Sequence, residues 1–221
     1  MQPKRSYVSP LREQAAARTR ELILSRATEL FAERGYGRVT VADIAAAAGV
    51  AAKTVFASVG SKSDILNRIV DQGVNASGYE RAMEALLAER SPESVLRTLA
   101  RGTRAGNEGQ FTVHEAIRKA LPVHEDGEAL WDRATADYRA ALRTAARHLH
   151  TLPPPPVYSV AETADLLWHW FGPTGWQSLV AESGWTWDRA EDVLYRTAHA
   201  ALLSRDPATG SGDDHPAEPT H

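Results

Sequence analysis

The chain of 221 residues is 43% hydrophobic and 24% charged, which is enough apolar material for a substantial core and excludes a wholly disordered protein. Because it has no cysteine, it has no disulfide, no thiol nucleophile and no cysteine-based metal site. No apolar run approaches the ~20 residues that span a bilayer, and the segment MQPKRSYVSPLREQ lacks the apolar stretch of a signal peptide, so we expect a cytoplasmic protein.

The net charge of −3 is unevenly distributed along the chain. Residues 1–70 hold 11 Lys and Arg against 6 Asp and Glu, a balance of +5, whereas the remainder holds 14 against 22, a balance of −8. A basic first third followed by an acidic remainder is the distribution expected when one part of a protein binds phosphate groups and the rest does not.

The N-terminal segment divides into an arm and a helix. The first twelve residues include Lys4, Arg5 and Arg12 with little apolar content, which predicts a flexible basic arm that is either solvated or in contact with nucleic acid. Over residues 13–34 the apolar side chains recur with the period of an amphipathic helix, and Gly35 predicts the end of that helix.

Two short helices and the start of a longer one are predicted next. Thr40 followed by Asp43 is a capping signal, because the hydroxyl can accept a backbone N–H while the acid favours a helix N-terminus. Gly49 predicts the end of this helix, since glycine readily adopts the left-handed conformation that reverses the chain. Ser61 with Asp64 repeats the capping signal and predicts another helix start.

The helix expected after Gly49 has an inner and an outer face. Val55 and Val59 can face inward, whereas Lys53 and Thr54 lie toward the outside. Two helices of this length bury little apolar surface alone, so they need the preceding helix as a third wall. The simplest alternative to a functional unit is a small helical bundle with a solvated basic face.

These residues resemble the TetR family of bacterial transcriptional regulators. The matching segments, which span about residues 18–70, are LFAERGYG, TVADIAAAAGV, KTVFASV and SKSDIL. The resemblance implies a helix-turn-helix that binds DNA, with phosphate contacts from Thr40 and Lys62. The positions that match its recognition helix are Ala51, Ala52, Lys53 and Thr54.

The implied contacts agree with the general chemistry of DNA recognition. Phosphate contacts set the register, while the exposed face of a helix in the major groove reads the bases. Lys53 can bond guanine acceptors, and alanine methyl groups can meet thymine methyl groups. Phe56 and Ser58 depart from the family, which usually has tyrosine at the first position and an aromatic residue or histidine at the second. Both remain candidate DNA-contacting positions.

Beyond about residue 78 the sequence predicts a larger helical body with several breaks. The Ser-Pro pair at 91–92 predicts a helix start, because proline is well tolerated at the first helical position. The Gly-Asn pair at 106–107 predicts a break in the helix that follows, and the Leu-Pro pair at 121–122 predicts another helix end.

Three further helices are predicted toward the C-terminus. A long helix with one apolar stripe is expected over residues 128–150, and the four prolines at 153–156 predict an extended connector after it. Ser159 with Glu162 is a capping box, and Thr186 predicts the start of the last helix.

The last helices are rich in tryptophan and resemble the C-terminal helix pair with which many TetR-type regulators form dimers. An aromatic helix pair suits a self-complementary two-fold interface, and the alternative is that its side chains form the core of a single chain. A dimer would also space two recognition helices ~34 Å apart over a palindrome. The predicted interface residues are Leu167, Trp168, Phe171, Trp176, Val193, Leu194 and Ala201.

A ligand pocket is predicted between the DNA-binding head and the dimerisation helices. Aromatic walls with few polar groups suit a small, largely apolar molecule, and the alternative for each candidate is ordinary core packing. The candidates are Arg104, Phe111, His114, Ile117, Trp131, Tyr138 and His169.

The sequence offers little support for an enzyme. His114 and Glu115 begin like the zinc motif H-E-x-x-H, but Arg118 stands where the second histidine belongs. His148 and His150 lie two residues apart on a predicted helix and point to different faces. We therefore expect no catalytic residues, no metal and no cofactor.

Together these observations predict an all-α protein with an N-terminal three-helix helix-turn-helix domain and a larger C-terminal helical domain for ligand binding and dimerisation. The expected function is a homodimeric repressor that binds palindromic operator DNA and is released by a small, largely apolar effector. The alternative is a helical DNA-binding dimer that has no small-molecule ligand and acts through protein partners. The predicted divisions are a basic arm at 1–12, a DNA-binding domain at 13–60, a ligand-binding and dimerisation domain at 61–205, and a disordered polar tail at 206–221.

Overall fold

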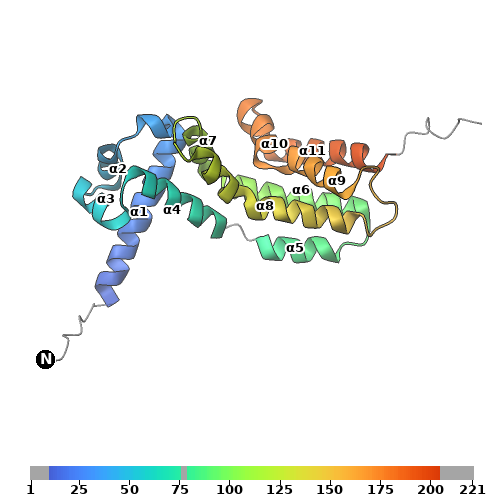
Figure 1. Ribbon diagram of the computed structural model, residues 1–221, viewed down its shortest axis with the longest axis horizontal. Helices are drawn as coiled ribbons and strands as arrows, with labels where there is room; N and C mark the ends of the chain where they lie inside the picture. Colours follow the sequence, from blue (N-terminus) through green and yellow to red (C-terminus); the bar gives the residue numbers. More distant parts are fainter. Residues whose placement is uncertain (1–9, 76–78, 205–221) are drawn as a thin grey trace, which may run out of the picture.

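The computed structural model describes residues 10–75 and 79–204, and all regular structure in those ranges is helical (Figure 1). The predicted all-α class is confirmed. The elements are α1 (Pro10–Arg34), the 3₁₀ helix η1 (Tyr36–Arg38), α2 (Val41–Ala48), α3 (Ala52–Val59), α4 (Lys62–Asn75), α5 (Tyr79–Ala88), α6 (Pro92–Gly109), α7 (Phe111–Ala120), α8 (Gly127–Leu149), α9 (Val160–Phe171), α10 (Pro173–Gln177), the π-helix η2 (Ser178–Glu182) and α11 (Trp187–Leu203).

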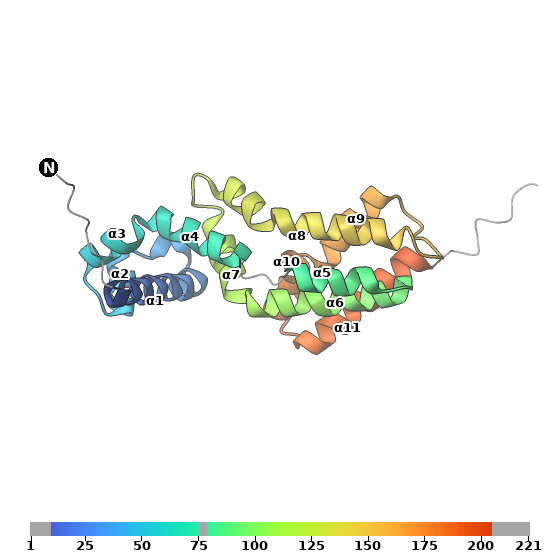
Figure 2. The ribbon, with the colours of Figure 1, turned by 90° about the horizontal axis from the view of Figure 1, so that it is seen from below.

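The molecule is elongated, with two groups of helices placed end to end. Helices α1 to α4 gather at one end, and α5, α6 and α8 to α11 form the other (Figure 1). Seen from below, α6 and α8 run along the length of the second group with α5 beside them (Figure 2). We call the first group the head and the second group the body.

Local capping signals identified most helix starts correctly. The Thr40 hydroxyl accepts from the Asp43 backbone N–H at 3.1 Å, while the Asp43 carboxylate accepts from the Thr40 backbone at 2.8 Å. The same reciprocal pair forms between Ser159 and Glu162 at the start of α9. Each pair satisfies helix N-terminal donors that have no partner inside the helix.

The predicted break at Gly106-Asn107 is wrong, because α6 continues through both residues to Gly109. The reason is tertiary. The Asn107 side chain is buried, and its Nδ2 donates to the Thr103 carbonyl at 2.7 Å and to the Tyr138 hydroxyl at 3.0 Å. A polar side chain that would otherwise favour a turn is therefore satisfied inside the body.

The predicted arm and tail lie largely outside the described residues. Residues 1–9 and 206–221 are not among them. Residues 10–12, predicted as part of the arm, are instead the first residues of α1. Proline at position 10 is compatible with this start because its missing N–H would have no helical partner there.

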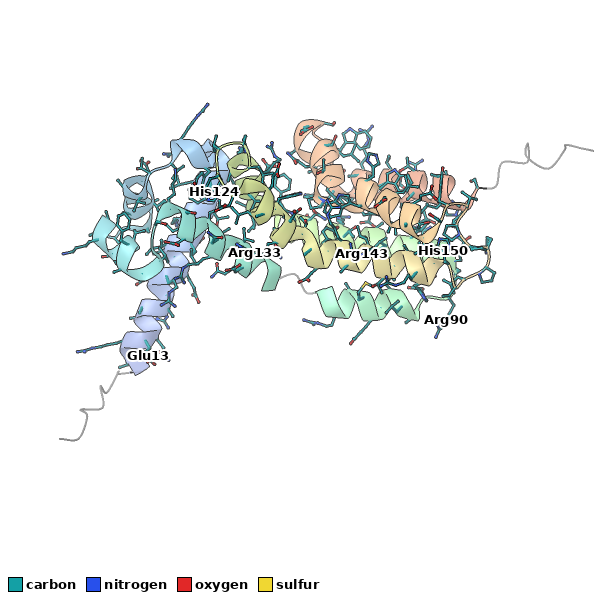
Figure 3. The ribbon with its side chains drawn as sticks, viewed as in Figure 1. Glu13, Arg90, His124, Arg133, Arg143 and His150 are labelled. Carbon is teal, nitrogen blue, oxygen red and sulfur yellow. The ribbon has the colours of Figure 1, made fainter. Side chains whose placement is uncertain are left out.

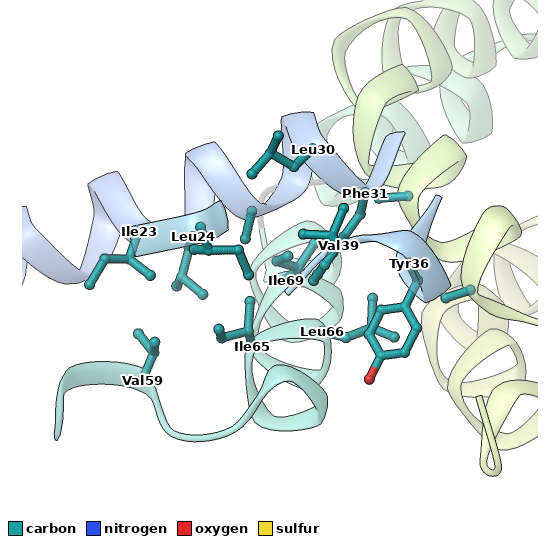
Figure 4. Packing of buried hydrophobic residues seen from close by; sticks show 14 of the residues in the cluster. Ile23, Leu24, Leu30, Phe31, Tyr36, Val39, Val59, Ile65, Leu66 and Ile69 are labelled. Atoms are coloured by element: carbon teal, nitrogen blue, oxygen red, sulfur yellow. The ribbon is translucent and has the colours of Figure 1, made fainter. Parts of the chain in front are cut away.

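The head is built around a continuous apolar core, here called the N-terminal core. Ile23 and Phe31 of α1 face Ile65 and Leu66 of α4 inside it, and all four are fully buried (Figure 4). Helices α2 and α3 complete this core, since Ile44, Val55 and Val59 are also buried in it. Helix α1 is the third wall that the sequence predicts for these two helices.

The N-terminal core extends beyond the head into α7 and α8. Ile117 and Ala120 of α7 and Leu130 of α8 belong to the same apolar cluster. A second cluster, here called the body core, is formed by apolar side chains of α5, α6, α8, α9, α10 and α11. Helix α7 is therefore packed against the head while it remains continuous with the body.

Three polar contacts reinforce this junction between head and body. The Lys119 ammonium of α7 donates to the Ala32 carbonyl of α1. His124, in the loop after α7, bonds the Ser63 hydroxyl at 2.9 Å, and Arg133 of α8 donates to the Asn67 side chain at 2.7 Å. His124 and Arg133 both lie beside α4 where the two groups of helices meet (Figure 3).

Across the described ranges, no single helix has both the length and the apolar character needed to cross a membrane. The pair α2 and α3 passes the length and composition criteria only when taken together, and it is bent by 98°.

Candidate functional site

Helices α2 and α3 form a helix-turn-helix. Their axes differ by 98°, and the turn begins at Gly49, whose φ of 66° is left-handed. The Gly49 N–H donates to the Ala46 carbonyl at 3.2 Å, and the Val50 N–H donates to the Ala45 carbonyl at 3.0 Å. These bonds close the end of α2 and redirect the chain at the near-right angle that is typical of this motif.

Helix α3 presents one face to the N-terminal core and the other to solvent. Val55 and Val59 are buried, with 0% and 1% of their surface exposed. On the opposite face Lys53 is exposed, and Phe56 keeps 56% of its surface exposed. An exposed helix face supported by a packed opposite face is a shape that can enter a DNA major groove.

The predicted DNA-contacting residues lie on or next to this face. Ala51, Ala52 and Lys53 are exposed at the start of α3, and Thr54 is half-buried. The exposed aromatic ring of Phe56 follows one turn later. The remaining predicted positions are Thr40 at the start of α2, Ser58 near the end of α3 and Lys62 at the start of α4.

The N-terminus of α3 differs from those of its neighbours because no side chain caps it. Ala51 occupies the capping position of α3 and makes no side-chain cap, whereas Thr40 caps α2 and Ser61 caps the start of α4. The first N–H groups of α3 are therefore available to water or to an external acceptor such as a phosphate oxygen.

Thr40 is committed to its cap. Its hydroxyl donates to the Asp43 carboxylate at 2.6 Å, and its backbone N–H donates to the same oxygen at 2.8 Å. These hydrogen bonds hold the pKa of Asp43 below its ordinary value, so the carboxylate stays ionised and keeps the cap closed. A phosphate approaching α2 would meet the backbone N–H groups after Thr40 more readily than its hydroxyl.

Lys62 is directed toward the interior of the head. Its ammonium donates to the carbonyls of Tyr36 and Val39, both at 3.0 Å, and lies 4.2 Å from the centre of the Tyr36 ring. A lysine ammonium has three hydrogens to donate, so one remains for an external acceptor. The side chain therefore ties α4 to the segment around η1 whether or not it also contacts a phosphate.

Two arginines that the sequence patterns did not single out hold the end of α3. Arg20 of α1 donates to the Ser58 carbonyl at 3.4 Å, and Arg68 of α4 donates to the Val59 carbonyl at 3.2 Å. Cations at a helix C-terminus satisfy free carbonyls and oppose the negative end of the helix dipole. No local motif marks these residues, because each lies on a different helix from the carbonyl it binds.

A half-open cavity of about 130 Å³, here called the body cavity, is lined by α5, α6, α7 and α8 together with the end of α4. Most of its wall is apolar, and the polar side chains lie mainly on α6, at the α6–α7 junction and on the facing sides of α7 and α8. The lining residues are Val70, Gly73, Ala82, Met83, Leu86, Thr98, Leu99, Gly102, Thr103, Gly106, Asn107, Gln110, Val113, His114, Ile117, Ala134, Asp137, Tyr138, Ala141 and Leu142.

Of the predicted pocket residues, His114, Ile117 and Tyr138 line this cavity. Burial lowers the pKa of His114 to about 4, so its imidazole is neutral at pH 7. The Tyr138 hydroxyl accepts from Asn107 and donates to the Phe171 carbonyl, and burial raises its pKa above the ordinary value. The cavity therefore carries hydrogen-bonding groups that are uncharged.

The other predicted pocket residues lie elsewhere. Arg104 binds Asp188 at 2.6 Å and Glu191 at 3.0 Å, which ties α6 to α11 and raises the Arg104 pKa. The Phe111 ring packs edge-on against Trp187 at 5.8 Å. Trp131 packs against the N-terminal core, and His169 is exposed on α9.

Asn107 is a cavity residue that the sequence interpretation missed. The sequence pattern predicts a helix break at this position. A polar residue in the middle of an apolar stripe could instead have indicated a polar group that faces a cavity. Gly102 and Gly106 also line the wall, and a Cβ added at Gly106 would meet no atom within 4 Å. Missing side chains on one helix face leave the space that the cavity occupies.

The predicted interface residues fall into two groups within the single chain, one half-buried and one buried. Trp168, Val193 and Ala201 are half-buried on α9 and α11. The Trp176 indole donates to the Phe171 carbonyl at 3.1 Å inside the body core. The interface candidates that the body core already buries are Leu167, Phe171, Trp176 and Leu194.

Among the described residues, no group of three His, Asp or Glu side chains is placed to hold a metal ion. His114 and Glu115, which begin the zinc-like sequence, have different surroundings. His114 lines the cavity, whereas Glu115 forms an ion pair with Arg118 at 2.9 Å.

Comparison with known proteins identifies the head. Residues 23–69 match the family model described as bacterial regulatory proteins, tetR family. This segment runs from the middle of α1 to the middle of α4 and includes the helix-turn-helix. No curated protein sequence gives a significant match to the chain.

Solved structures resemble the chain over most of its length. A transcriptional regulator from Saccharomonospora viridis in complex with choline has a TM-score of 0.68 at 20% identity, covering 86% of this chain and 100% of its own. The TetR family regulator PfmR from Thermus thermophilus has a TM-score of 0.60 at 23% identity, covering 86% and 98%. The regulator FadR from Bacillus subtilis in complex with stearoyl-CoA has a TM-score of 0.65 at 16% identity, covering 82% and 98%.

Proposed function

From the premise that this chain carries the DNA-binding head of the TetR family of bacterial transcriptional regulators, we propose that it represses transcription as a homodimer bound to a palindromic operator. Helix α3 reads the DNA, and a small molecule in the body cavity releases it. The predicted resemblance to this family is confirmed. The repressor role, the dimer and the effector are proposed here.

The observation that carries DNA binding is the outer face of α3. Lys53 and Phe56 are exposed there, and the first N–H groups of the helix lack a side-chain cap. Lys53 supplies a cation that can bond the O6 and N7 acceptors of guanine. Ala51 and Ala52 supply methyl groups of the kind that contact thymine.

The excess of basic side chains in the first third supports the same orientation. Residues 1–70 carry a formal charge of +5 within a chain of net charge −3. The acidic Asp43 and Asp64 are held by hydrogen bonds at helix starts and do not compete for the outer face of α3. A basic head on an acidic body favours one orientation on a polyanion.

Dimerisation is supported by the geometry of recognition and by the outer faces of α9 and α11. One recognition helix reads few base pairs, and a two-fold dimer doubles that number with a fixed spacing of ~34 Å. Trp168, Val193 and Ala201 are the predicted interface residues that remain partly exposed, so they are the ones available to a second copy.

Control by a small molecule is supported by the position of α7. This helix lines the cavity with His114 and Ile117, and it packs against α1 of the head through Lys119. Ligand binding that favours one placement of α7 would change the placement of α3 relative to its counterpart in the dimer. Affinity for DNA would then fall by the difference in ligand affinity between the two states.

The proposal is tested by selecting duplexes from a random DNA pool with the purified chain and measuring its affinity for a selected and a scrambled duplex by fluorescence anisotropy. We expect binding to weaken steeply with salt and to favour the selected duplex by at least about tenfold. Equal affinity for both duplexes over a range of salt concentrations would rule out a sequence-reading role.

Two variants localise the reading surface. We expect Lys53→Ala to reduce the preference for the selected duplex, because a lysine contact to a base edge discriminates among sequences. Arg90→Ala removes an exposed cation from the turn between α5 and α6 in the body and serves as the control, with affinity unchanged (Figure 3). If the two substitutions had the same effect, Lys53 would have no reading role.

A further inference from the structure

The charges around the body cavity restrict the kind of molecule that can enter it. Of the twenty residues that line it in the described part of the chain, Asp137 is the only acidic one, and neither lysine nor arginine is among them. Asp137 itself is exposed on α8. A carboxylate or phosphate in the cavity would therefore lose its hydration without gaining a counter-ion, which is costly in an apolar site.

Two arginines on helices that line the cavity are held in ion pairs with other residues. Arg104 on α6 is held on the α11 side by Asp188 and Glu191, and Arg118 on α7 is paired with Glu115. Both guanidiniums already have carboxylate partners. Neither can neutralise an anionic ligand in the cavity without breaking these ion pairs.

Three polar side chains of the wall are uncharged. Asn107 and Tyr138 are hydrogen-bonded to each other, and they hold the α6 and α8 sides of the cavity together. His114 lines the wall from α7, and its ring nitrogens make no hydrogen bond to another described side chain or carbonyl. A neutral imidazole provides one N–H donor and one nitrogen acceptor. Of Asn107, Tyr138 and His114, only His114 has side-chain nitrogens that are not already used in a hydrogen bond within the described residues.

The size of the cavity sets a second limit. Its volume of about 130 Å³ is close to the ~150 Å³ of an engineered apolar cavity that binds benzene. A molecule with one ring or a short branched chain fits this space. A long acyl chain would extend beyond this space through the open side of the cavity.

We propose that the cavity binds a compact, uncharged, largely apolar molecule that carries one hydroxyl or carbonyl group, and that His114 makes the hydrogen bond to that group. This inference rests on the proposed function in taking the cavity as the effector site. The apolar side chains around it, such as Leu86, Leu99 and Val113, enclose the hydrocarbon part of the molecule.

The inference is tested with four probes of similar shape: benzyl alcohol, benzoate, benzylammonium and toluene. Their dissociation constants for the full chain are measured at pH 7 by NMR titration. We expect benzyl alcohol to bind at least about tenfold more tightly than benzoate, which loses hydration without a counter-ion. We also expect it to bind more tightly than benzylammonium, because Asp137, the one carboxylate among the described lining residues, is exposed to solvent on α8 and so attracts a cation only weakly. We expect it to bind about fivefold more tightly than toluene, which cannot form the hydrogen bond.

Two variants assign the hydrogen bond. We expect His114→Phe to remove the preference for benzyl alcohol over toluene while toluene still binds, because phenylalanine retains the apolar wall. His199→Phe makes the same exchange on α11, outside the cavity lining, and should leave all four affinities unchanged. A preference for benzyl alcohol that persisted in His114→Phe would refute the role of His114.

Failure of this inference can be separated from failure of the proposed function. DNA binding of each protein is measured in parallel on the selected duplex. Tightest binding of benzoate or benzylammonium, or no binding of any probe, would overturn the ligand class while sequence-selective DNA binding stood. If His114→Phe lost the preference for benzyl alcohol over toluene while its DNA affinity was unchanged, the result would support the proposed ligand class and the role of His114.

Discussion

The N-terminal core and the body core use their polar side chains in opposite ways. In the head, Lys62, Arg20 and Arg68 donate to backbone carbonyls around the core, and the buried side chains of the core are apolar. In the body the polar groups lie inside. The buried polar side chains among the described residues are Thr103, Asn107, Thr135 and Thr163, all on α6, α8 or α9.

This difference matches the tasks that the two regions would have. A head that must fit a DNA groove benefits from one well-defined shape, which apolar packing and satisfied helix ends provide. A body that must accept a ligand needs unfilled space and buried hydrogen-bonding groups, both of which reduce stability. Substitutions in the two regions should therefore have different effects on stability.

The largest effect is expected from the apolar packing of the head. Phe31→Ala removes a fully buried ring from the N-terminal core and should lower the free energy of unfolding by about 3–5 kcal/mol. Phe56→Ala makes the same change at a ring that is 56% exposed and should alter it by less than about 0.5 kcal/mol. Urea denaturation measures both, and similar losses for the two variants would contradict the assigned packing.

The next effect concerns the neutral histidine of the body. Burial lowers the pKa of His114 from its ordinary 6.5 to about 4. As the pH falls through this range the unfolded chain binds a proton at His114 while the folded protein does not, so the free energy of unfolding decreases. The loss should reach on the order of 3 kcal/mol at pH 4 and should be absent above pH 7.

His114→Gln should remove this part of the pH dependence, because glutamine does not titrate. Glu115 on the same helix and Asp137 across the cavity are retained in both proteins, as are Asp43 and Asp64 with their lowered pKa values. Chemical denaturation at several pH values between 4 and 7.5 gives the comparison. Parallel curves for the two proteins would show that His114 is not buried in its neutral form.

A smaller effect is expected where Lys62 ties α4 to η1. Lys62→Met retains the aliphatic stem but removes two charge-assisted hydrogen bonds, so the free energy of unfolding should fall by about 1–3 kcal/mol. Lys53→Met, at an exposed lysine, is the matched control and should be nearly neutral for stability. Thermal unfolding followed by circular dichroism distinguishes them, and a neutral Lys62→Met would remove its structural role.

The smallest effect is expected inside the body. Tyr138→Phe deletes the hydroxyl between Asn107 and the Phe171 carbonyl, but Asn107 keeps its bond to Thr103 and the carbonyl keeps its bond from Trp176. No partner is left unsatisfied, so the loss should be about 1 kcal/mol. A loss above about 3 kcal/mol in urea denaturation would mean that these remaining bonds do not compensate.

The sequence predicted local features of the fold well because they depend on neighbouring residues. The capping pairs at Thr40, Ser61 and Ser159 and the turn at Gly49 each involve side chains and backbone within a few positions. Two short helices and the turn between them followed from these signals. The resemblance to the TetR family implied that they form a helix-turn-helix, and the family comparison confirms this resemblance over residues 23–69.

Features that depend on distant residues were less accessible to sequence reasoning. An apolar stripe predicts a buried helix face but does not say whether the same chain or a second copy covers it. Leu167 and Leu194 illustrate this, since both were predicted at an interface and both are buried within the body core. Asn107 is a second example. The sequence predicts a helix break there, because the hydrogen bond from its side chain to Tyr138 forms only in the folded body.

The central claim, that the outer face of α3 reads DNA, is tested most directly by amide hydrogen exchange of the chain with and without the selected duplex. The account predicts slower exchange on DNA binding at residues 51–56, at the uncapped start of α3, with little change in α8 and α11 of the body. Protection confined to the body, with residues 51–56 unchanged, would contradict it.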